Sequence, residues 1–256
     1  MSKAPGVVGT VGHVGHVGLV GYVADTIAFS NVDGPGNRFV VFLQGCNFDC
    51  LACHNPQTIP HADGAHFATT VDDLTARIRR AAPFVRGVTV SGGEATQQPE
   101  FLNELFKAIK ADPVTAGLTC FVDSNGACPP ATWDRLAAVM DGAMIDLKCL
   151  DTDIHLRSTG QLNDDVLASI EHLAQLGLLY EVRLLLVAGV NDDPDLLRRT
   201  GEWLAGVDPS MRLKVIGFRA HGARPHSPAL VPPTPESLHA AADLLRSVSP
   251  FDITVI

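Results

Sequence analysis

Short apolar runs alternate with longer amphipathic segments along the chain from Arg38 onward. An apolar run bounded by turn residues predicts a buried strand, whereas apolar residues that recur every three or four positions predict a helix. The predicted strands are Phe39–Leu43, Val88–Ser91, Leu118–Asp123, Ala143–Lys148, Glu181–Val187, Leu213–Phe218 and a short Ile253–Ile256. The predicted helices are Val71–Ala82, Glu100–Ala111, Thr132–Met140, Asp165–Leu176, Pro194–Ala205 and Pro235–Ser247.

This alternation predicts an α/β fold with six successive strand–helix units, because helical crossovers make neighbouring strands parallel. Six units are fewer than the eight of a closed barrel, so the expected architecture is a partial, TIM-like (β/α)6 barrel. No break in the alternation marks a second domain, and we expect a single domain over residues 21–256. The Gly/Val/His-rich start of the chain is expected to form a flexible tail over residues 1–20.

Composition narrows the class of protein. The 256 residues are 46% hydrophobic and 18% charged, which is typical of a globular protein. The formal net charge of −9 argues against nucleic acid or an anionic membrane surface as the main partner. No apolar run is long enough to span a bilayer. Because the six cysteines lack the regular spacing of a disulfide framework, a reducing compartment is favoured and we expect a cytoplasmic protein.

The most informative motif follows the first predicted strand. Cys46, Cys50 and Cys53 have the spacing C-x3-C-x2-C within one short segment. Three thiolates in one loop can hold one face of an iron–sulfur cube and leave the fourth iron without a protein ligand. The same three cysteines with the neighbouring His54 could instead hold a structural zinc ion. Cys120, Cys128 and Cys149 are scattered singly and are expected to be core or loop residues.

Polar and glycine-rich motifs follow the other predicted strands, and the carboxyl ends of parallel strands meet at one edge of a sheet. They are Ser91-Gly92-Gly93-Glu94-Ala95, Asp123-Ser124-Asn125-Gly126, Asp146-Leu147-Lys148 and Gly217-Phe218-Arg219-Ala220-His221-Gly222. Taken singly, each has a simpler interpretation as a turn, an ion pair or a surface loop. A tight turn, Asp33-Gly34-Pro35-Gly36, precedes the first strand.

In combination these motifs resemble the radical S-adenosylmethionine (SAM) superfamily, and within it the glycyl-radical-enzyme activases. The cysteine loop with Gly-Gly-Glu one unit later carries the likeness to the superfamily, and the Asp-Gly-Pro-Gly and Cys-His-Asn segments narrow it to the activases. The resemblance implies a partial (β/α)6 barrel that holds a [4Fe–4S] cluster on Cys46, Cys50 and Cys53. No further cysteines lie between Cys53 and Gly92, so the chain is similar to the short activases without a ferredoxin-like insert.

The resemblance also implies which residues contact SAM, whose methionyl group would chelate the open iron. The implied contacts are Gly92, Gly93 and Glu94 beside the amino group, Lys148 at a carboxylate or ribose oxygen, Ala52 near the adenine, and Arg219 or His221 at the far rim. Asp123, Ser124, Asp146 and the backbone carbonyl of Met144 match positions that hold a monovalent cation in the family. No catalytic residue is implied beyond the cluster and SAM.

The implied activity is reductive cleavage of SAM and removal of a hydrogen atom from a glycine of a partner protein. The implied partners are a glycyl radical enzyme and an electron donor such as flavodoxin or ferredoxin. Two alternatives remain open at this point: a radical SAM enzyme acting on a small molecule or a ribosomal peptide, and a non-enzymatic zinc-binding module.

Overall fold

The computed structural model describes residues 18–61 and 67–256, so most of the expected tail lies outside the described residues. One sheet of nine strands runs through the molecule in the order β3-β1-β2-β4-β5-β6-β7-β8-β9. The strands are β1 (Val20–Ser30), β2 (Arg38–Leu43), β3 (Ala68–Thr70), β4 (Gly87–Gly92), β5 (Thr119–Ser124), β6 (Gly142–Asp146), β7 (Leu179–Leu186), β8 (Arg212–Gly217) and β9 (Asp252–Val255).

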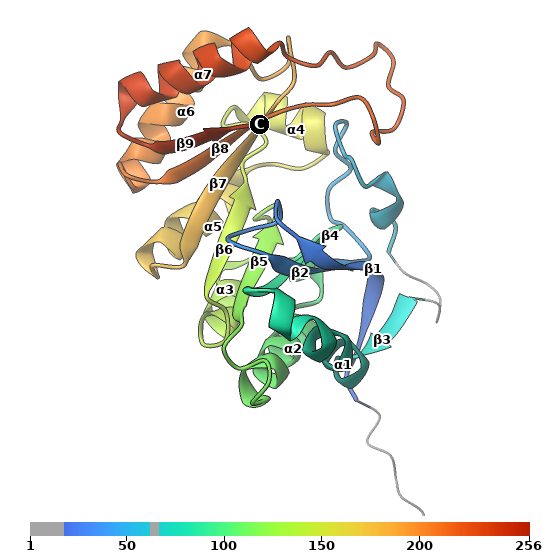
Figure 1. The fold of residues 1–256 in the computed structure, drawn as a ribbon. Helices are drawn as coiled ribbons and strands as arrows, with labels where there is room; N and C mark the ends of the chain where they lie inside the picture. Colours follow the sequence, from blue (N-terminus) through green and yellow to red (C-terminus); the bar gives the residue numbers. More distant parts are fainter. Residues whose placement is uncertain (1–17, 62–66) are drawn as a thin grey trace, which may run out of the picture.

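The sheet is curved but unclosed, with β3 at one edge and β9 at the other (Figure 1). Every pair from β2–β4 to β8–β9 is parallel, whereas β1 runs antiparallel to both β2 and β3. This arrangement confirms the predicted partial barrel. The carboxyl ends of β2, β4, β5 and β6 consequently lie side by side, and each is followed by one of the motifs found in the sequence.

Helices connect the parallel strands and cover the outer face of the sheet. They are α1 (Val71–Ala81), α2 (Pro99–Ala111), α3 (Pro130–Ala137), α4 (Thr152–Thr159), α5 (Asp164–Gln175), α6 (Pro194–Val207) and α7 (Pro235–Val248). Helices α6 and α7 pack together beside β8 and β9 (Figure 1). Fully buried aliphatic side chains such as Val41, Val90 and Ile145 fill the space between the strands and the helices. All six predicted helices are present with shifted ends.

Three labelled elements of the described residues were not predicted: β1, α4 and the edge strand β3, which spans only three residues. Strand β1 has only a partial in–out alternation, and its pairing with β2 contains two register irregularities, so its periodicity is weak. Helix α4 spans eight residues and has little apolar periodicity, but its ends are well marked. The Asp151 side chain accepts a hydrogen bond from the Ile154 amide at the start, and Gly160 ends the helix with a φ of 80°.

Candidate active site

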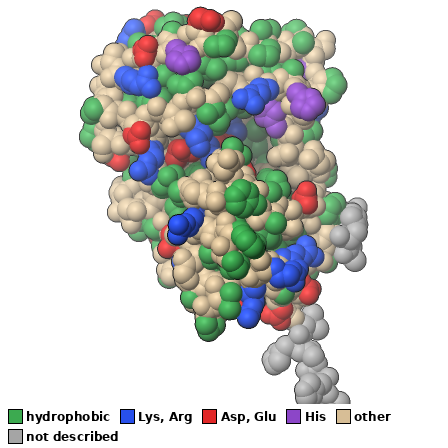
Figure 2. Space-filling model, viewed as in Figure 1, with side chains coloured by type: hydrophobic (Ala, Val, Ile, Leu, Met, Phe, Trp, Pro, Cys, Tyr) green, Lys and Arg blue, Asp and Glu red, His purple; other side chains and the backbone are tan. Residues whose placement is uncertain are grey.

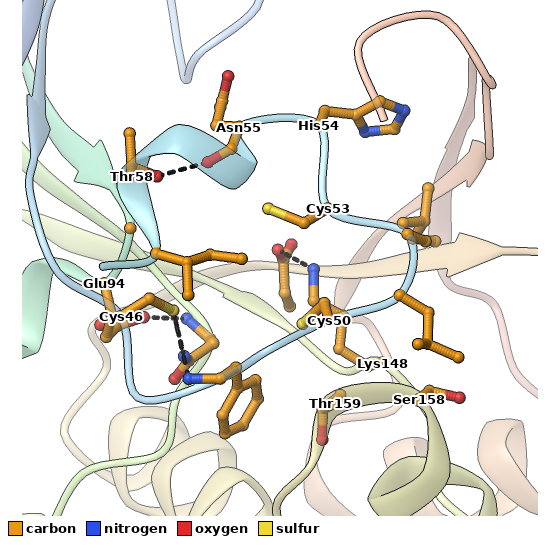
Figure 3. A pocket seen from close by; sticks show the side chains of 18 of the residues that line it. Cys46, Cys50, Cys53, His54, Asn55, Thr58, Glu94, Lys148, Ser158 and Thr159 are labelled. Carbon is orange, nitrogen blue, oxygen red and sulfur yellow. Dashed lines mark hydrogen bonds and ion pairs between the residues drawn. The ribbon is translucent and has the colours of Figure 1, made fainter. Parts of the chain in front are cut away.

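A cavity of about 230 Å³ opens at the carboxyl ends of the parallel strands. Eleven of the thirteen predicted site residues line it: Cys46, Cys50, Ala52, Cys53, Gly92, Gly93, Glu94, Asp123, Ser124, Asp146 and Lys148. The sulfur atoms of the three cysteines face the space that the loop encircles, with Glu94 and Lys148 at its sides (Figure 3). The structure therefore gathers residues that lie up to about a hundred positions apart in the sequence.

Backbone hydrogen bonds hold the cysteine loop on two sides. On one side the amides of Gly45 and Cys46 donate to the carbonyls of Thr58 and Ile59, at 2.9 and 3.0 Å. On the other side the amides of Asp49 and Leu51 donate to carbonyls at the end of α4, each at 2.9 Å. These acceptors are the carbonyls of Thr159 and Ser158. Helix α4, which the periodicity did not reveal, thus fixes the loop that carries the three cysteines.

The three thiols of this loop are free. Burial raises the pKa of Cys46 to about 12 and that of Cys50 to about 11. These thiols therefore keep their protons at neutral pH until a metal replaces them. Three sulfur donors that face one cavity and form no disulfide suit a [4Fe–4S] cluster with one open iron. The fit is to a cluster and not to a single ion: among the described residues, no group of three or more His, Cys, Asp or Glu side chains is arranged to bind one metal ion.

Gly92 and Gly93 pass so close to the cysteine loop that no side chain fits at either position. A Cβ at Gly92 would lie 2.2 Å from the Leu43 nitrogen, and one at Gly93 would lie 2.3 Å from the Gly45 oxygen. The backbone uses this proximity, because the Glu94 amide donates to the Gly45 carbonyl at 2.8 Å. The Gly-Gly pair therefore joins the end of β4 to the cysteine loop and is more than a simple turn.

Glu94 is buried and joins the ends of β4 and β5. One carboxylate oxygen accepts hydrogen bonds from the amide and hydroxyl of Thr96 and from the hydroxyl of Ser124, at 2.7 to 2.9 Å. The other oxygen accepts a hydrogen bond from the Asn125 amide at 2.7 Å. Burial raises the pKa of Glu94, and the four hydrogen bonds oppose that rise. Because it lines the cavity, this carboxylate can also accept a hydrogen bond from an ammonium group there.

Two ion pairs neutralise the acidic side chains at the ends of β5 and β6. Arg183 of β7 lies 2.8 Å from Asp123, and Lys148 lies 2.6 Å from Asp146. Burial opposes the charged forms of Asp146 and Lys148, but their mutual attraction outweighs it. The pKa of Asp146 therefore lies below its usual value and that of Lys148 above its own. At Asp123 burial prevails over the attraction of Arg183 and raises the pKa.

The segment after β8 contacts the cysteine loop through the Arg219 carbonyl and the side chains of Phe218 and Arg224. Arg219 and His221 are exposed and do not line the cavity, so their contact with SAM stays a prediction. The carbonyl of Arg219 lies 2.8 Å from Nε2 of His54, whose ring stacks on Phe218. Further along this segment, Arg224 donates to the carbonyls of Asp49 and Cys50, each at 3.0 Å. Residues 218–231 therefore form a strap across the outer side of the cysteine loop.

Several residues that line the cavity were not among the predicted site residues. Phe48 lies inside the cysteine motif, and its ring packs edge-on against His155 of α4. Asn125 lies in the predicted Asp-Ser-Asn-Gly turn, and its side chain donates to Asn47 Oδ1 at 2.8 Å. Asn191 lines the opposite wall and donates to the Lys148 carbonyl. Only Asn125 could have been found, because it belongs to one of the strand-end motifs.

The Asp-Gly-Pro-Gly turn lies near the start of the parallel strands and is braced from inside the barrel. Thr89 donates its hydroxyl proton to the Asp33 carbonyl at 2.7 Å. The fully buried Arg38 donates to Thr89, to the Pro35 carbonyl and to the Val88 carbonyl. Burial lowers the pKa of Arg38 to about 10. This turn is therefore fixed by an arginine that stands two residues after the motif in the sequence.

Comparison with known proteins agrees with this geometry. Residues 40–199 match the family model of the radical SAM superfamily. The chain therefore belongs to the radical SAM superfamily, whose members use a [4Fe–4S] cluster and SAM.

More specific relatives narrow the family. The chain is 33% identical over 205 residues to the pyruvate formate-lyase-activating enzyme of Staphylococcus epidermidis, covering 76% of this chain and 80% of that protein. It is 32% identical over 238 residues to the pyruvate formate-lyase-activating enzyme of Streptococcus mutans, covering 88% and 90%. Within the superfamily the chain belongs to the family of glycyl-radical-enzyme activating enzymes, as the motifs predicted.

A solved structure shares the fold. The match is to a domain of pyruvate-formate lyase-activating enzyme from Bacteroides vulgatus, with a TM-score of 0.56 and 24% sequence identity. It covers 66% of this chain and 98% of that chain.

Among the described residues, no helix is long and apolar enough to cross a membrane.

Proposed function

We propose that this protein activates a glycyl radical enzyme by cleaving SAM reductively and installing a radical on a glycine of that partner. The observation that carries the proposal is the convergence of three free cysteine thiols with Gly92, Gly93 and Glu94 on one cavity. The family of the chain supports it, because the relatives are activating enzymes by name. Membership in the radical SAM superfamily argues against the zinc-binding module.

Cys46, Cys50 and Cys53 would hold a [4Fe–4S] cluster, which would supply the electron for reductive cleavage of SAM and so the means to remove a hydrogen atom from the partner's glycine. The chain's own residues would bind and orient SAM. Glu94 would accept a hydrogen bond from its amino group, and the absence of side chains at Gly92 and Gly93 would allow a close approach. Lys148 would neutralise its carboxylate or contact a ribose oxygen, and Ala52 would contact the adenine; all five residues line the cavity. The cavity wall, including Phe48 and Leu185, limits the access of water.

Further parts of the proposal concern the surroundings of the site. A monovalent cation would lie between Asp123, Ser124, Asp146 and the Met144 carbonyl, sharing the two carboxylates with Arg183 and Lys148. An external donor such as flavodoxin or ferredoxin would supply the electron, Arg219 or His221 would contact SAM, and the enzyme would work in the cytoplasm. Residues 21–256 would form the single domain that does this, since one sheet spans the chain from β1 to β9.

The deciding test is electron paramagnetic resonance of a candidate glycyl radical enzyme after anaerobic incubation with the reconstituted protein, SAM and dithionite. We expect a glycyl doublet on the partner and one 5′-deoxyadenosine per radical. Cys50→Ala is the control and should give neither signal. If 5′-deoxyadenosine forms but no encoded candidate acquires a doublet, the partner assignment is wrong and a small molecule or a ribosomal peptide becomes the better substrate.

A further inference from the structure

A second hollow lies on the outer side of the sheet, between the second half of β1 and the end of α1. Its volume is about 470 Å³, and it is lined by Thr26, Ala28, Phe29, Phe39, Arg77, Arg80, Ala81 and Phe84. We call it the β1–α1 groove. None of its residues lines the active-site cavity. It lies toward the start of β2, because Ile27 pairs with Val40 and Ser30 with Arg38, whereas the cavity lies at the end of β2.

Aromatic side chains leave this groove unusually apolar for a surface. Phe84 is 70% exposed and Phe29 is 54% exposed, and Ile27 of the same strand is also exposed. Single exposed apolar residues are normal, but a contiguous group beside a groove marks a surface that another molecule covers. Figure 2 shows hydrophobic side chains gathered over β1 and β2 with basic side chains beside them.

The backbone beside the groove is an open strand edge. Strand β3 pairs with β1 only from Val20 to Tyr22. Beyond Tyr22, β1 has β2 on one side and no other strand of the described residues on the other. Such an edge offers amide and carbonyl groups to an extended segment of another chain, and neighbouring pockets then select alternate side chains.

The charge at the groove indicates the chemistry of that segment. Arg77 and Arg80 of α1 are exposed and line the groove. Among residues 18–61 and 67–256, no acidic side chain forms an ion pair with either arginine. The whole chain carries a formal net charge of −9, so two unpaired arginines at one apolar groove form a local exception. An acidic side chain on the docked segment would complement them.

We propose that the β1–α1 groove docks an extended segment of the partner enzyme that carries apolar side chains next to Asp or Glu. This inference rests on the proposed function. Only a short loop of a folded partner can enter a cavity of about 230 Å³, so contacts inside the cavity supply limited affinity for the rest of that protein. A docking site outside the cavity adds affinity for the whole partner without changing the chemistry at the glycine.

The test compares two forms of the substrate, the full-length glycyl radical enzyme encoded in the same genome and a synthetic peptide of its glycine loop. Phe29→Ser with Phe84→Ser removes the apolar contacts, and Arg77→Glu with Arg80→Glu reverses the charge. Matched controls are Leu176→Ser, at an exposed position at the end of α5, which packs on β6 and β7, and Arg198→Glu on α6. Radical yield by paramagnetic resonance and the dissociation constant of the full-length partner by calorimetry are the readouts.

We expect each double variant to raise KM and the dissociation constant for the full-length partner about tenfold or more. Activation of the peptide and SAM cleavage should stay at the wild-type level, and the controls should leave all values unchanged. Unchanged binding of the full-length partner in both double variants would overturn the docking site, as would an equal loss with the peptide. The proposal would also be overturned if the wild-type protein sedimented as a dimer and both double variants as monomers. A second copy of the chain would then fill the groove.

Failure of the proposed function gives a different result. The wild-type protein would then install no radical on either substrate. The calorimetric comparison still decides the docking site in that case, because it measures association and not chemistry.

Discussion

The strand ends on the two sides of the cavity contribute to it in different ways. At β2, β4, β5 and β6, residues of the strand-end motifs line the cavity themselves, as Glu94 and Lys148 do. At β8, the side chains of Arg219 and His221 face solvent, and the strap holds the cysteine loop through the Arg219 carbonyl and the Arg224 guanidinium. The hydrogen bonds between adjacent parallel strands also fix the residues that come directly after each strand. A long connection, by contrast, is held only by the contacts that it makes itself.

This difference shows how well the position of a motif in the sequence predicts the position of its residues in the site. A residue next to the end of a buried strand has little freedom, so its position in the sequence nearly determines its position in the site. A residue several positions into a connection can exchange a side-chain contact for a backbone contact. The following substitutions test that distinction, beginning with the largest expected effect.

Replacement of a cysteine in the loop should have the largest effect. Cys50→Ala removes one of three sulfur donors, so we expect iron content and 5′-deoxyadenosine formation to fall by more than about a hundredfold, beyond the cost typical of substitutions in the outer shell of metal sites. Cys149→Ala, at a buried cysteine outside the loop, is the matched control and should keep both. Normal 5′-deoxyadenosine formation by Cys50→Ala would remove the basis for the metal site.

Glu94→Gln should weaken SAM binding by roughly 10- to 100-fold, the range expected when hydrogen bonds to a charged group are lost. All four of its present partners are donors, and an amide nitrogen in place of one oxygen would face a donor. Equilibrium dialysis with the reconstituted protein measures the affinity. The control is Glu100→Gln on the exposed side of α2, and equal affinities in the two variants would contradict the assigned role.

The strap should respond more weakly, and through the side chain of Arg224 rather than that of Arg219. Arg224→Ala removes the donors that cap the Asp49 and Cys50 carbonyls, so hydrogen exchange at the amides of residues 49–51 should accelerate by roughly three- to tenfold. Arg219→Ala should leave that exchange unchanged, because its carbonyl makes the contact with His54. If Arg219→Ala loosened the loop and Arg224→Ala did not, the Arg224 guanidinium would not be the group that holds the loop.

The smallest effect concerns the helix that supports the loop from the other side. His155 is buried, burial lowers its pKa, and its Nε2 has no hydrogen-bond partner among the described residues. The unfolded chain binds a proton on this histidine below about pH 6.5, whereas the folded chain resists it, so the neutral form stabilises the fold above that pH. Stability should therefore be lost as the pH falls from about 6.5 through the lower folded-state pKa.

His155→Asn should remove this contribution while offering a donor to the Gln161 carbonyl that Nδ1 now contacts. We expect the loss of unfolding free energy between pH 7 and pH 5.5 to be smaller in the variant by about 1 kcal/mol or less. Urea unfolding at the two pH values measures it. A steeper loss in the variant than in the wild type would contradict the assigned direction.

The sequence was sufficient to predict the features that depend on the period of apolar residues and on the spacing of motifs. Strands β2, β4, β5 and β6 consist mostly of buried residues because both faces of the sheet are covered there, and the strand-end motifs follow them directly. Strand β1 and helix α4 were not predicted, because β1 is irregularly paired and α4 is short with weak amphipathicity. The capping residues Asp151 and Gly160 were the available signal for α4.

The positions of Arg219 and Phe48 could not be inferred in the same way. Which group of Arg219 faces the loop depends on the path of residues 218–231, and that path is set by long-range contacts such as the bridge between Ala188 and Val231. Phe48 contributes because α4 brings His155 beneath it, so its role depended on an element that the periodicity did not predict.

The two glycines at the end of β4 have a consequence for mutational tolerance. In a saturation-mutagenesis library selected for function, codons 92 and 93 should accept synonymous changes only, because even alanine would place an atom about 2.2 or 2.3 Å from the backbone before the first cysteine. Ser91, whose side chain donates to Asp123, should tolerate threonine. Two adjacent positions without any accepted substitution would show that the end of β4 and the backbone before the first cysteine cannot be changed independently of each other.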